Sequence, residues 1–222
     1  MPLLGSAMTS INGQPLTLAL PKGRILQELA PLLAQAGIDI SPLTDDSRRL
    51  MVDVNNRSVR LLLMRASDVP TYVSYGVADV GVSGSDTLLE EQADLLEPLD
   101  LGLGKCRMVV AAPESRAGRG FNQPWIKVAT KYPNITRQFF RRCGIEAIIV
   151  KLYGSVELAC ISGLADLVVD LVSTGATLQA NKLVEIETIT EISSRLVVNR
   201  ASLKTRCAEI DGLVQSLKTA LQ

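Results

Sequence analysis

The sequence predicts an α/β protein built as two lobes with a central cleft. Two series of alternating strands and helices follow one another along the 222 residues, and a further strand and helix close the chain. Apolar residues make up 47% of the chain, enough for a sizeable core. We expect the C-terminal segment to return to the first lobe. This gives a flexible N-terminus at 1–14, lobe I at 15–104 plus 186–222, and lobe II at 105–185.

The first series starts with a short apolar strand and an amphipathic helix. Apolar side chains recur every three or four residues from Ile25 to Ala36, and Gly37 suits the helix C-cap. Asn55-Asn56 favours a tight turn between two strands. The expected elements are, in order, strand 16–20, helix 24–36, hairpin strands 50–54 and 59–64, helix 67–75, strand 78–83 and helix 85–92.

The second series is rich in β-branched residues. A Gly-, Arg- and Pro-rich stretch at 114–124 interrupts it and predicts an exposed loop, too short to separate independent domains. The expected elements are strand 106–113, strand 126–130, helix 134–143, strand 146–152, helix 155–162, strand 165–172, a helix that starts near Thr174, strand 183–190, strand 195–199 and helix 202–221.

Composition excludes several classes of function. The 23 basic and 23 acidic residues cancel, so neither a nucleic acid nor a membrane is an expected partner. The N-terminus does not have the pattern of a signal peptide, and no apolar run is long enough to span a membrane, so we expect a cytoplasmic protein. The four scattered cysteines form no CxxC pair and are expected to be small buried residues. Because the chain has no histidine, its chemistry must proceed without imidazole.

The stretch ADLVVDLVSTGATLQAN at 165–181 is the strongest candidate site. A loop between a buried strand and a helix offers backbone N–H groups to a phosphate, and its hydroxyls add donors. Asp170 would repel a phosphate but can accept hydrogen bonds from sugar hydroxyls, so a ribose phosphate fits better than free phosphate. No Walker A lysine follows. On chemistry alone, an ordinary N-cap turn is an equally good interpretation.

Six ordered blocks resemble the ATP phosphoribosyltransferase family, over nearly the whole chain after Leu16. They are LALPKGRI at 18–25, RASDVPTYV at 65–73, DVGVSGSD at 79–86, KLYGSVELA at 151–159, ELACISGLADLVVDLVSTGATL at 157–178 and SSRLVVN at 193–199. The resemblance implies transfer of the phosphoribosyl group of phosphoribosyl pyrophosphate (PRPP) to N1 of ATP, the first step of histidine biosynthesis. A ring nitrogen with a free lone pair needs no strong base, which agrees with the missing histidine.

The resemblance also implies the roles of individual residues. Those expected to bind PRPP are Glu157, Asp170, Ser173, Thr174, Gly175, Ala176 and Thr177. Those expected to bind ATP are Lys22, Arg65, Ser83, Gly84 and Asp86. Arg24 and Arg48 are the expected catalytic arginines on the substrates' phosphates, although Arg49 could replace Arg48. The implied cofactor is Mg²⁺, held mainly through substrate phosphates and not by a firm set of protein ligands.

Further implications concern fold and partners. The family's catalytic fold is similar to type II periplasmic-binding-protein-like folds, which agrees with two lobes and a cleft. The chain resembles the family's short form, without a C-terminal regulatory domain. Short forms act with a histidyl-tRNA-synthetase-like regulatory subunit in a hetero-octamer, which contains homodimers of catalytic chains.

Three alternatives remain. A non-catalytic, two-lobed binding protein would share the architecture, but it would not need Asp170 ahead of a phosphate loop. A purine-salvage phosphoribosyltransferase would also use PRPP, but its loop usually carries two adjacent acids where this chain has Val169-Asp170. A degenerate regulatory paralogue is the third, and the intact signature argues against it.

Overall fold

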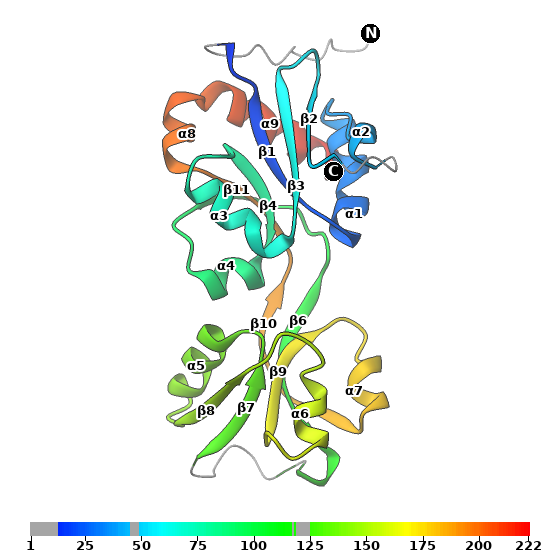
Figure 1. The fold of residues 1–222 in the computed structure, drawn as a ribbon, viewed down its shortest axis with the longest axis vertical. Coiled ribbons are helices and arrows are strands. Elements are labelled where there is room, and N and C mark those ends of the chain that lie inside the picture. Colours follow the sequence, from blue (N-terminus) through cyan, green and yellow to red (C-terminus); the bar gives the residue numbers. More distant parts are fainter. Residues whose placement is uncertain (1–12, 45–48, 117, 119–124) are drawn as a thin grey trace. The chain divides into compact units, whose positions relative to one another are not determined.

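The computed structural model describes residues 13–44, 49–116, 118 and 125–222. The chain forms two compact units. Unit 1 contains the described residues up to Leu88, together with Gln92–Gly104 and Ser193–Gln222, and unit 2 contains Leu89–Glu91 and Lys105–Ile192. Both units are α/β, with helices packed on a mixed sheet (Figure 1).

The sheet of unit 1 has the strand order β2-β3-β1-β4-β11-β5. Strands β1, β3 and β4 run parallel, whereas β2 and β11 run antiparallel to their neighbours. The elements of this unit are β1 (Leu16–Pro21), α1 (Arg24–Gln35), α2 (Ser41–Thr44), β2 (Met51–Val54), β3 (Val59–Met64), α3 (Val69–Ser74), β4 (Val80–Gly84), the first four residues of α4 (Ser85–Glu91), β5 (Leu96–Asp100), β11 (Ser194–Val198), α8 (Arg200–Thr205) and α9 (Cys207–Ala220).

Alternate residues of these strands enter two apolar layers, as the two-residue period of a strand requires. On one face, Leu18 and Leu20 of β1 pack with the buried sides of α1 and α9. On the other face, Ala19 packs with Val69 and Val73 of α3. The sheet is therefore covered by helices on both sides.

Unit 2 repeats this plan with the strand order β10-β6-β9-β7-β8. Strands β7, β8 and β9 run parallel, and β6 is antiparallel to both β9 and β10. The elements are β6 (Cys106–Pro113), β7 (Ile126–Thr130), α5 (Pro133–Arg142), β8 (Ala147–Lys151), α6 (Glu157–Ile161), β9 (Leu167–Val172), α7 (Ala176–Ala180) and β10 (Leu183–Ile192).

The core of unit 2 is also split between the two faces of its sheet. Val169 of β9 packs with Phe140 of α5 on one face. On the other, Val168 lies with Cys160 of α6 and Leu178 of α7. The strand that ends at the candidate phosphate loop is thus fixed on both faces, which gives the loop a rigid base.

Several details differ from expectation. Strand β5 and the short helix α2 were not predicted, and the expected terminal helix is divided into α8 and α9. The chain returns to unit 1 at Ser193 instead of residue 186, because β10 pairs with β6 as far as Ile192. Residues 1–12 and most of the expected loop at 114–124 lie outside the described residues.

The cysteines do not share one environment. Cys160 is buried, Cys106 is half-buried, and Cys143 and Cys207 are exposed, so the expectation of four buried cysteines was wrong for two. Burial raises the pKa of the Cys160 thiol to about 11, which makes it a poor nucleophile. In the part of the chain that the structure describes, no helix is long and apolar enough to cross a membrane.

Candidate functional site

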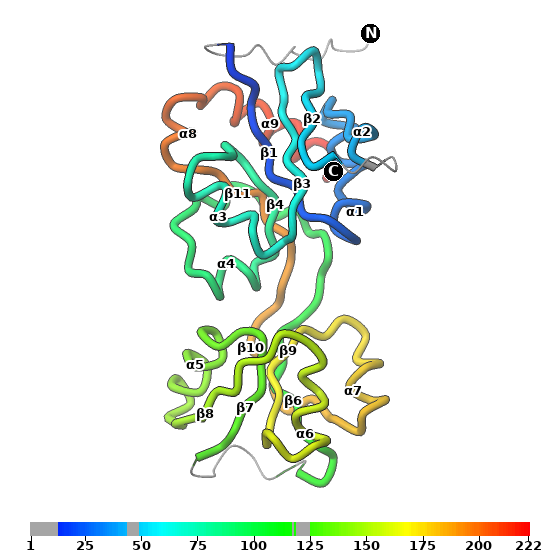
Figure 2. Tube along the Cα trace, viewed as in Figure 1, coloured from blue at the N-terminus to red at the C-terminus, as the bar shows by residue number. Residues whose placement is uncertain are grey.

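The carboxyl ends of three parallel strands meet at one edge of the unit 2 sheet. Thr130, the last residue of β7, is in register with Val169 of β9 and with Lys151 of β8. Lys131, the turn after β8 and residues 173–177 after β9 therefore leave the sheet at the same edge, where the chain trace turns from β9 toward α7 (Figure 2). In α/β sheets, ligands bind beyond this edge.

Asp170 lies near the end of β9, half-buried. Burial raises the pKa of its carboxyl group, and the charge of Glu157 raises it further. A hydrogen bond from the Leu171 N–H, with N···Oδ1 at 2.9 Å, and the charge of Lys131 act in the opposite direction. The structure thus places Asp170 within electrostatic range of Glu157, another predicted PRPP residue, and of Lys131.

Residues 173–177, which we call the phosphate loop, connect Asp170's strand to α7. Ser173, Thr174, Ala176 and Thr177 are exposed, and Gly175 is half-buried with φ of +81°. This left-handed backbone favours glycine and turns the chain into the helix. The side chains at the loop are therefore available to a ligand.

The phosphate loop caps the N-terminus of α7 only weakly. The Thr174 Oγ1 accepts from the Ala176 N–H over a long 3.4 Å, and no side chain caps α7 in the usual way. The helix expected near Thr174 begins only at Ala176 and has five residues, so its dipole adds little. The backbone N–H groups and hydroxyls of the phosphate loop are the main donors here.

An ion pair that the sequence did not suggest lies beside the phosphate loop. Arg107 of β6 and Glu185 of β10 are joined by two hydrogen bonds, Nε···Oε2 at 3.0 Å and Nη2···Oε1 at 2.5 Å. Arg107 Nη1 also donates to the carbonyl oxygen of Ser173 at 3.4 Å. The two residues are 78 positions apart and are not opposite each other in the sheet, because Arg107 of β6 pairs with Glu191 and Glu185 of β10 pairs with Ala111. Their side chains meet along the strands, a contact that spacing in the sequence does not reveal.

In unit 1, the predicted ATP residues also gather at carboxyl ends of parallel strands. Lys22 follows β1, Arg65 follows β3, and Gly84 ends β4. The Lys22 N–H donates to the carbonyl oxygen of Met64 at 2.8 Å, which extends the β1–β3 pairing to the edge of the sheet. Lys22 and Arg65 are exposed there, as expected for ligand-binding cations.

The serine and aspartate of this group differ in access. Ser83 is 1% exposed, and its hydroxyl donates to the Gly84 carbonyl oxygen over a long 3.5 Å. Asp86 folds back over Gly84, where a Cβ would collide with its carboxylate. Gly84 and Asp86 are half-buried in the turn, whereas the side chain of Ser83 is buried.

Of the two predicted catalytic arginines, the structure describes Arg24. It is exposed in the first turn of α1, and its Nε donates to Glu28 Oε1 at 2.6 Å. Arg48 lies outside the described residues, and Arg49 is exposed. The choice between Arg48 and Arg49 stays a prediction.

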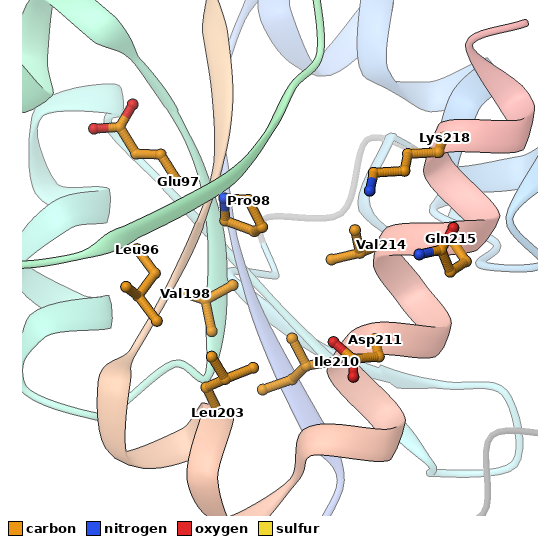
Figure 3. A pocket seen from close by; sticks show the side chains of 10 residues that line it. All are labelled: Leu96, Glu97, Pro98, Val198, Leu203, Ile210, Asp211, Val214, Gln215 and Lys218. Carbon is orange, nitrogen blue, oxygen red and sulfur yellow. The ribbon is translucent and has the colours of Figure 1, made fainter.

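Two further features bear on ligands. Among the described residues, no group of three or more Cys, Asp or Glu side chains is placed to hold a metal ion. A pocket of about 390 Å³ lies in unit 1 between β5 and α9, with an apolar wall that includes Leu96, Val198, Ile210 and Val214 (Figure 3). None of the predicted site residues lines this pocket.

Comparisons with known proteins agree on one family. Residues 65–219 match the family model described as "HisG: ATP phosphoribosyltransferase". The chain is 50% identical over 205 residues to ATP phosphoribosyltransferase 2 of Geobacter sulfurreducens, covering 91% of this chain and 97% of that one. It is 52% identical over 206 residues to ATP phosphoribosyltransferase of Acidithiobacillus ferrooxidans, covering 91% and 96%. Among solved structures, it is similar to the ATP phosphoribosyl transferase (HisG:HisZ) complex from Thermotoga maritima, with a TM-score of 0.81, 34% identity, and coverage of 93% and 98%.

Proposed function

The chain belongs to the ATP phosphoribosyltransferase family, the enzymes of the first step of histidine biosynthesis, and from this premise we propose that unit 2 binds PRPP and unit 1 binds ATP. The observation that carries the proposal is the placement of Asp170. A half-buried carboxylate lies within electrostatic range of Glu157 and Lys131, three residues before an exposed loop rich in hydroxyls and backbone N–H groups. A ribose 5-phosphate needs this combination of an acceptor for its hydroxyls and donors for its phosphate.

The reaction needs no imidazole. The lone pair of adenine N1 forms a bond to C1 of the ribose, while the bond from C1 to the pyrophosphate oxygen breaks and its electron pair leaves with the pyrophosphate. The positive charge on the adenine is relieved when its exocyclic nitrogen releases a proton to solvent. Because N1 carries a free lone pair, no strong base has to prepare it.

Positioning and charge are the main contributions that remain for the protein. We propose that the phosphate loop holds the 5-phosphate, and that Asp170 accepts hydrogen bonds from the ribose hydroxyls, with Glu157 on the same substrate. Arg24 and Arg48 neutralise the phosphates of the leaving group and of ATP, for which guanidinium forks are suited. Lys22, Arg65, Ser83, Gly84 and Asp86 form the ATP side; for Ser83 the contact is through its backbone, because its side chain is buried.

We propose that Asp170 and Glu157 would hold Mg²⁺ together with the substrate phosphates, and that the ion would supply charge neutralisation for the leaving pyrophosphate. Mg²⁺ in proteins is commonly held by one or two carboxylates together with substrate phosphates. The donor set here fits that pattern, because Asp170 and Glu157 are two carboxylates within electrostatic range of each other. In this proposal, Asp170 and Glu157 do not have to bind Mg²⁺ when no substrate is present.

The proposed protein partners of this chain are inferred from its structural relative. Since the Thermotoga maritima protein is solved as a HisG:HisZ complex, we propose that this chain is a short-form catalytic subunit that binds a HisZ-type, histidyl-tRNA-synthetase-like subunit in a hetero-octamer. Homodimers of catalytic chains and feedback by histidine through the partner belong to the same proposal. ATP and PRPP are metabolites of the cytoplasm, so we place the reaction there.

The test combines purified chain with ATP, PRPP and Mg²⁺, and follows the ultraviolet absorbance of an N1-ribosylated adenine nucleotide. We expect product from the chain or from its complex with a HisZ-type subunit. Histidine should inhibit only the complex. Absence of product in both preparations would refute the proposed activity, and tight inhibition of the isolated chain would refute the short-form assignment.

A further inference from the structure

We propose that Arg107, held by Glu185, is a positioning residue for the phosphate loop: its guanidinium fixes the peptide between Ser173 and Thr174 so that the loop is ready for the 5-phosphate. This inference rests on the proposed function, which assigns the loop to PRPP. It concerns residues on β6 and β10, neither of which was a predicted part of the site.

The pairing of β6 with β9 brings Arg107 to the loop. Arg107 is in register with Val172, the last residue of β9, so its side chain starts directly beside the first residue of the loop. From there Nη1 reaches the carbonyl oxygen of Ser173 at 3.4 Å. The contact is long, but it is charge-assisted, and it falls on the first peptide group of the loop.

Glu185 fixes the guanidinium in place. It accepts from Nε and Nη2 at 3.0 and 2.5 Å, a two-point pairing that leaves the planar group little freedom to rotate. The hydrogen bond with Glu185 also raises the pKa of Arg107 above its ordinary value, so the guanidinium remains protonated. Glu185 Oε1 lies 3.6 Å from where a Cβ on Gly175 would be, so the pair underlies both ends of the turn.

Because the peptide group is planar, the contact at the Ser173 carbonyl oxygen also fixes the direction of the Thr174 N–H. A trans peptide is planar, and its C=O and N–H point in opposite directions. With the Ser173 carbonyl directed to Arg107, the Thr174 N–H is directed away from the ion pair. A loop without Arg107 has no such constraint, and its N–H would have to be ordered by the substrate at the cost of affinity.

Charge gives Arg107 a second effect. Paired, Arg107 and Glu185 contribute no net charge beside the loop, whereas Glu185 alone would repel a phosphate. Arg107→Ala therefore removes the constraint and exposes the carboxylate. In the double variant with Glu185→Ala the constraint is lost but no unpaired Glu185 remains, so part of the defect should be recovered.

The test is steady-state kinetics with each substrate varied in turn, in the presence of the HisZ-type subunit if the chain requires it. We expect Arg107→Ala to raise KM for PRPP about tenfold, the equivalent of one charge-assisted hydrogen bond, and to change KM for ATP by less than about twofold. Arg107→Lys keeps the charge without the fork and should fall between. The double variant should bind PRPP better than Arg107→Ala.

A matched control comes from unit 1. Arg60 and Asp53 join β3 to β2 at 2.7 Å, with side-chain exposures of 34% and 31%, the same values as for Arg107 and Glu185. Arg60→Ala should lose similar stability and leave KM for PRPP unchanged. An unchanged KM for PRPP in folded Arg107→Ala, or an equal rise for both substrates, would overturn the inference. If Arg107→Ala does not fold, PRPP titration of Arg107→Lys and Glu185→Gln by calorimetry decides, and wild-type affinity in both would overturn it.

A Thr174→Ala variant distinguishes failure of the proposed PRPP site from failure of the role proposed for Arg107. If the loop does not bind PRPP, then Thr174→Ala will also leave KM for PRPP unchanged. If only the present inference is wrong, Thr174→Ala will weaken PRPP use while Arg107→Ala does not.

Discussion

Glu28 joins Arg24 to the backbone of Gly104. Its Oε1 accepts from Arg24 Nε at 2.6 Å, and its Oε2 accepts from the Gly104 N–H at 2.9 Å. Gly104 is the last residue of unit 1 before the chain enters unit 2, and it also packs against Ile25 of α1. One carboxylate therefore contacts both a proposed catalytic arginine and the residue at which the segment Gln92–Gly104 of unit 1 ends.

This arrangement predicts that replacing Arg24 mainly lowers activity, whereas replacing Glu28 lowers stability. Arg24→Ala should reduce kcat by about a hundredfold, as loss of a transition-state phosphate contact does, with little change in stability because the arginine is exposed. Glu28→Ala should cost about 1 kcal/mol of stability, since the Gly104 N–H loses its partner. Urea unfolding and initial rates measure the two. Equal stability losses in both variants would contradict this role of Glu28.

The backbone of Gly175 predicts that effects on stability and on PRPP binding can be separated by comparing two glycine variants. Its φ of +81° disfavours any side chain, so Gly175→Ala should cost about 1 kcal/mol and distort the phosphate loop. Gly163, at the end of α6, has φ of +75° and open space where an added methyl group would lie, so Gly163→Ala carries the same backbone cost. Only Gly175→Ala should raise KM for PRPP. A comparable rise in Gly163→Ala would mean that strain, not loop geometry, controls binding.

The contacts of Arg206 predict a purely structural role for Asp79, the first residue of the DVGVSGSD segment at 79–86. Its guanidinium contacts Asp79 at 2.9 Å, Glu209 at 2.6 Å and the carbonyl oxygen of Pro15 at 2.8 Å, and all three charged side chains are largely buried. Arg206→Ala should cost about 3 kcal/mol because two largely buried carboxylates lose the cation that neutralises them.

The control for Arg206 is an exposed pair nearby. Arg200 contacts Asp94 at 2.8 Å with exposures of 56% and 81%, so Arg200→Ala should cost less than about 1 kcal/mol. Thermal or urea unfolding compares the two variants. KM for both substrates should stay near wild type in each, and a selective loss of ATP use in Arg206→Ala would assign Asp79 a direct role.

The sequence was most informative where local pattern determines structure. The β-branched run before Ser173 predicted the strand at 165–172, and β9 occupies 167–172 of it. The Asn55-Asn56 turn predicted the hairpin of β2 and β3, which the register confirms. In both places the period of apolar residues and the turn chemistry point to the same element.

Elements that depend on distant partners were missed. Strand β5 reads LEPLD, and a proline with two acids argues against a strand. It forms because β11 pairs with it at the sheet edge, where a proline at an irregular position loses no required hydrogen bond. The Arg107–Glu185 pair was missed for the same reason: no spacing along the chain signals a contact created by the pairing of two strands.

Asp170 connects the proposed chemistry to stability. Burial, with the charge of Glu157, raises the pKa of this carboxyl group in the folded protein. Between the ordinary value, near 4, and the raised value, the folded state binds more protons than the unfolded state. Stability attributable to this group therefore falls as pH rises through that window, and the charged carboxylate at neutral pH opposes folding.

We therefore expect Asp170→Asn to be more stable than wild type at pH 7, while its kcat/KM for PRPP falls at least about tenfold because a charged acceptor for the ribose hydroxyls is lost. Asparagine can still accept from the Leu171 N–H, so the local fold is kept. The gain should shrink as pH falls and disappear below about pH 4, where the aspartate is protonated in both states. Urea unfolding of both proteins at several pH values measures it. A stability difference that is constant with pH would show that the buried charge is not its source.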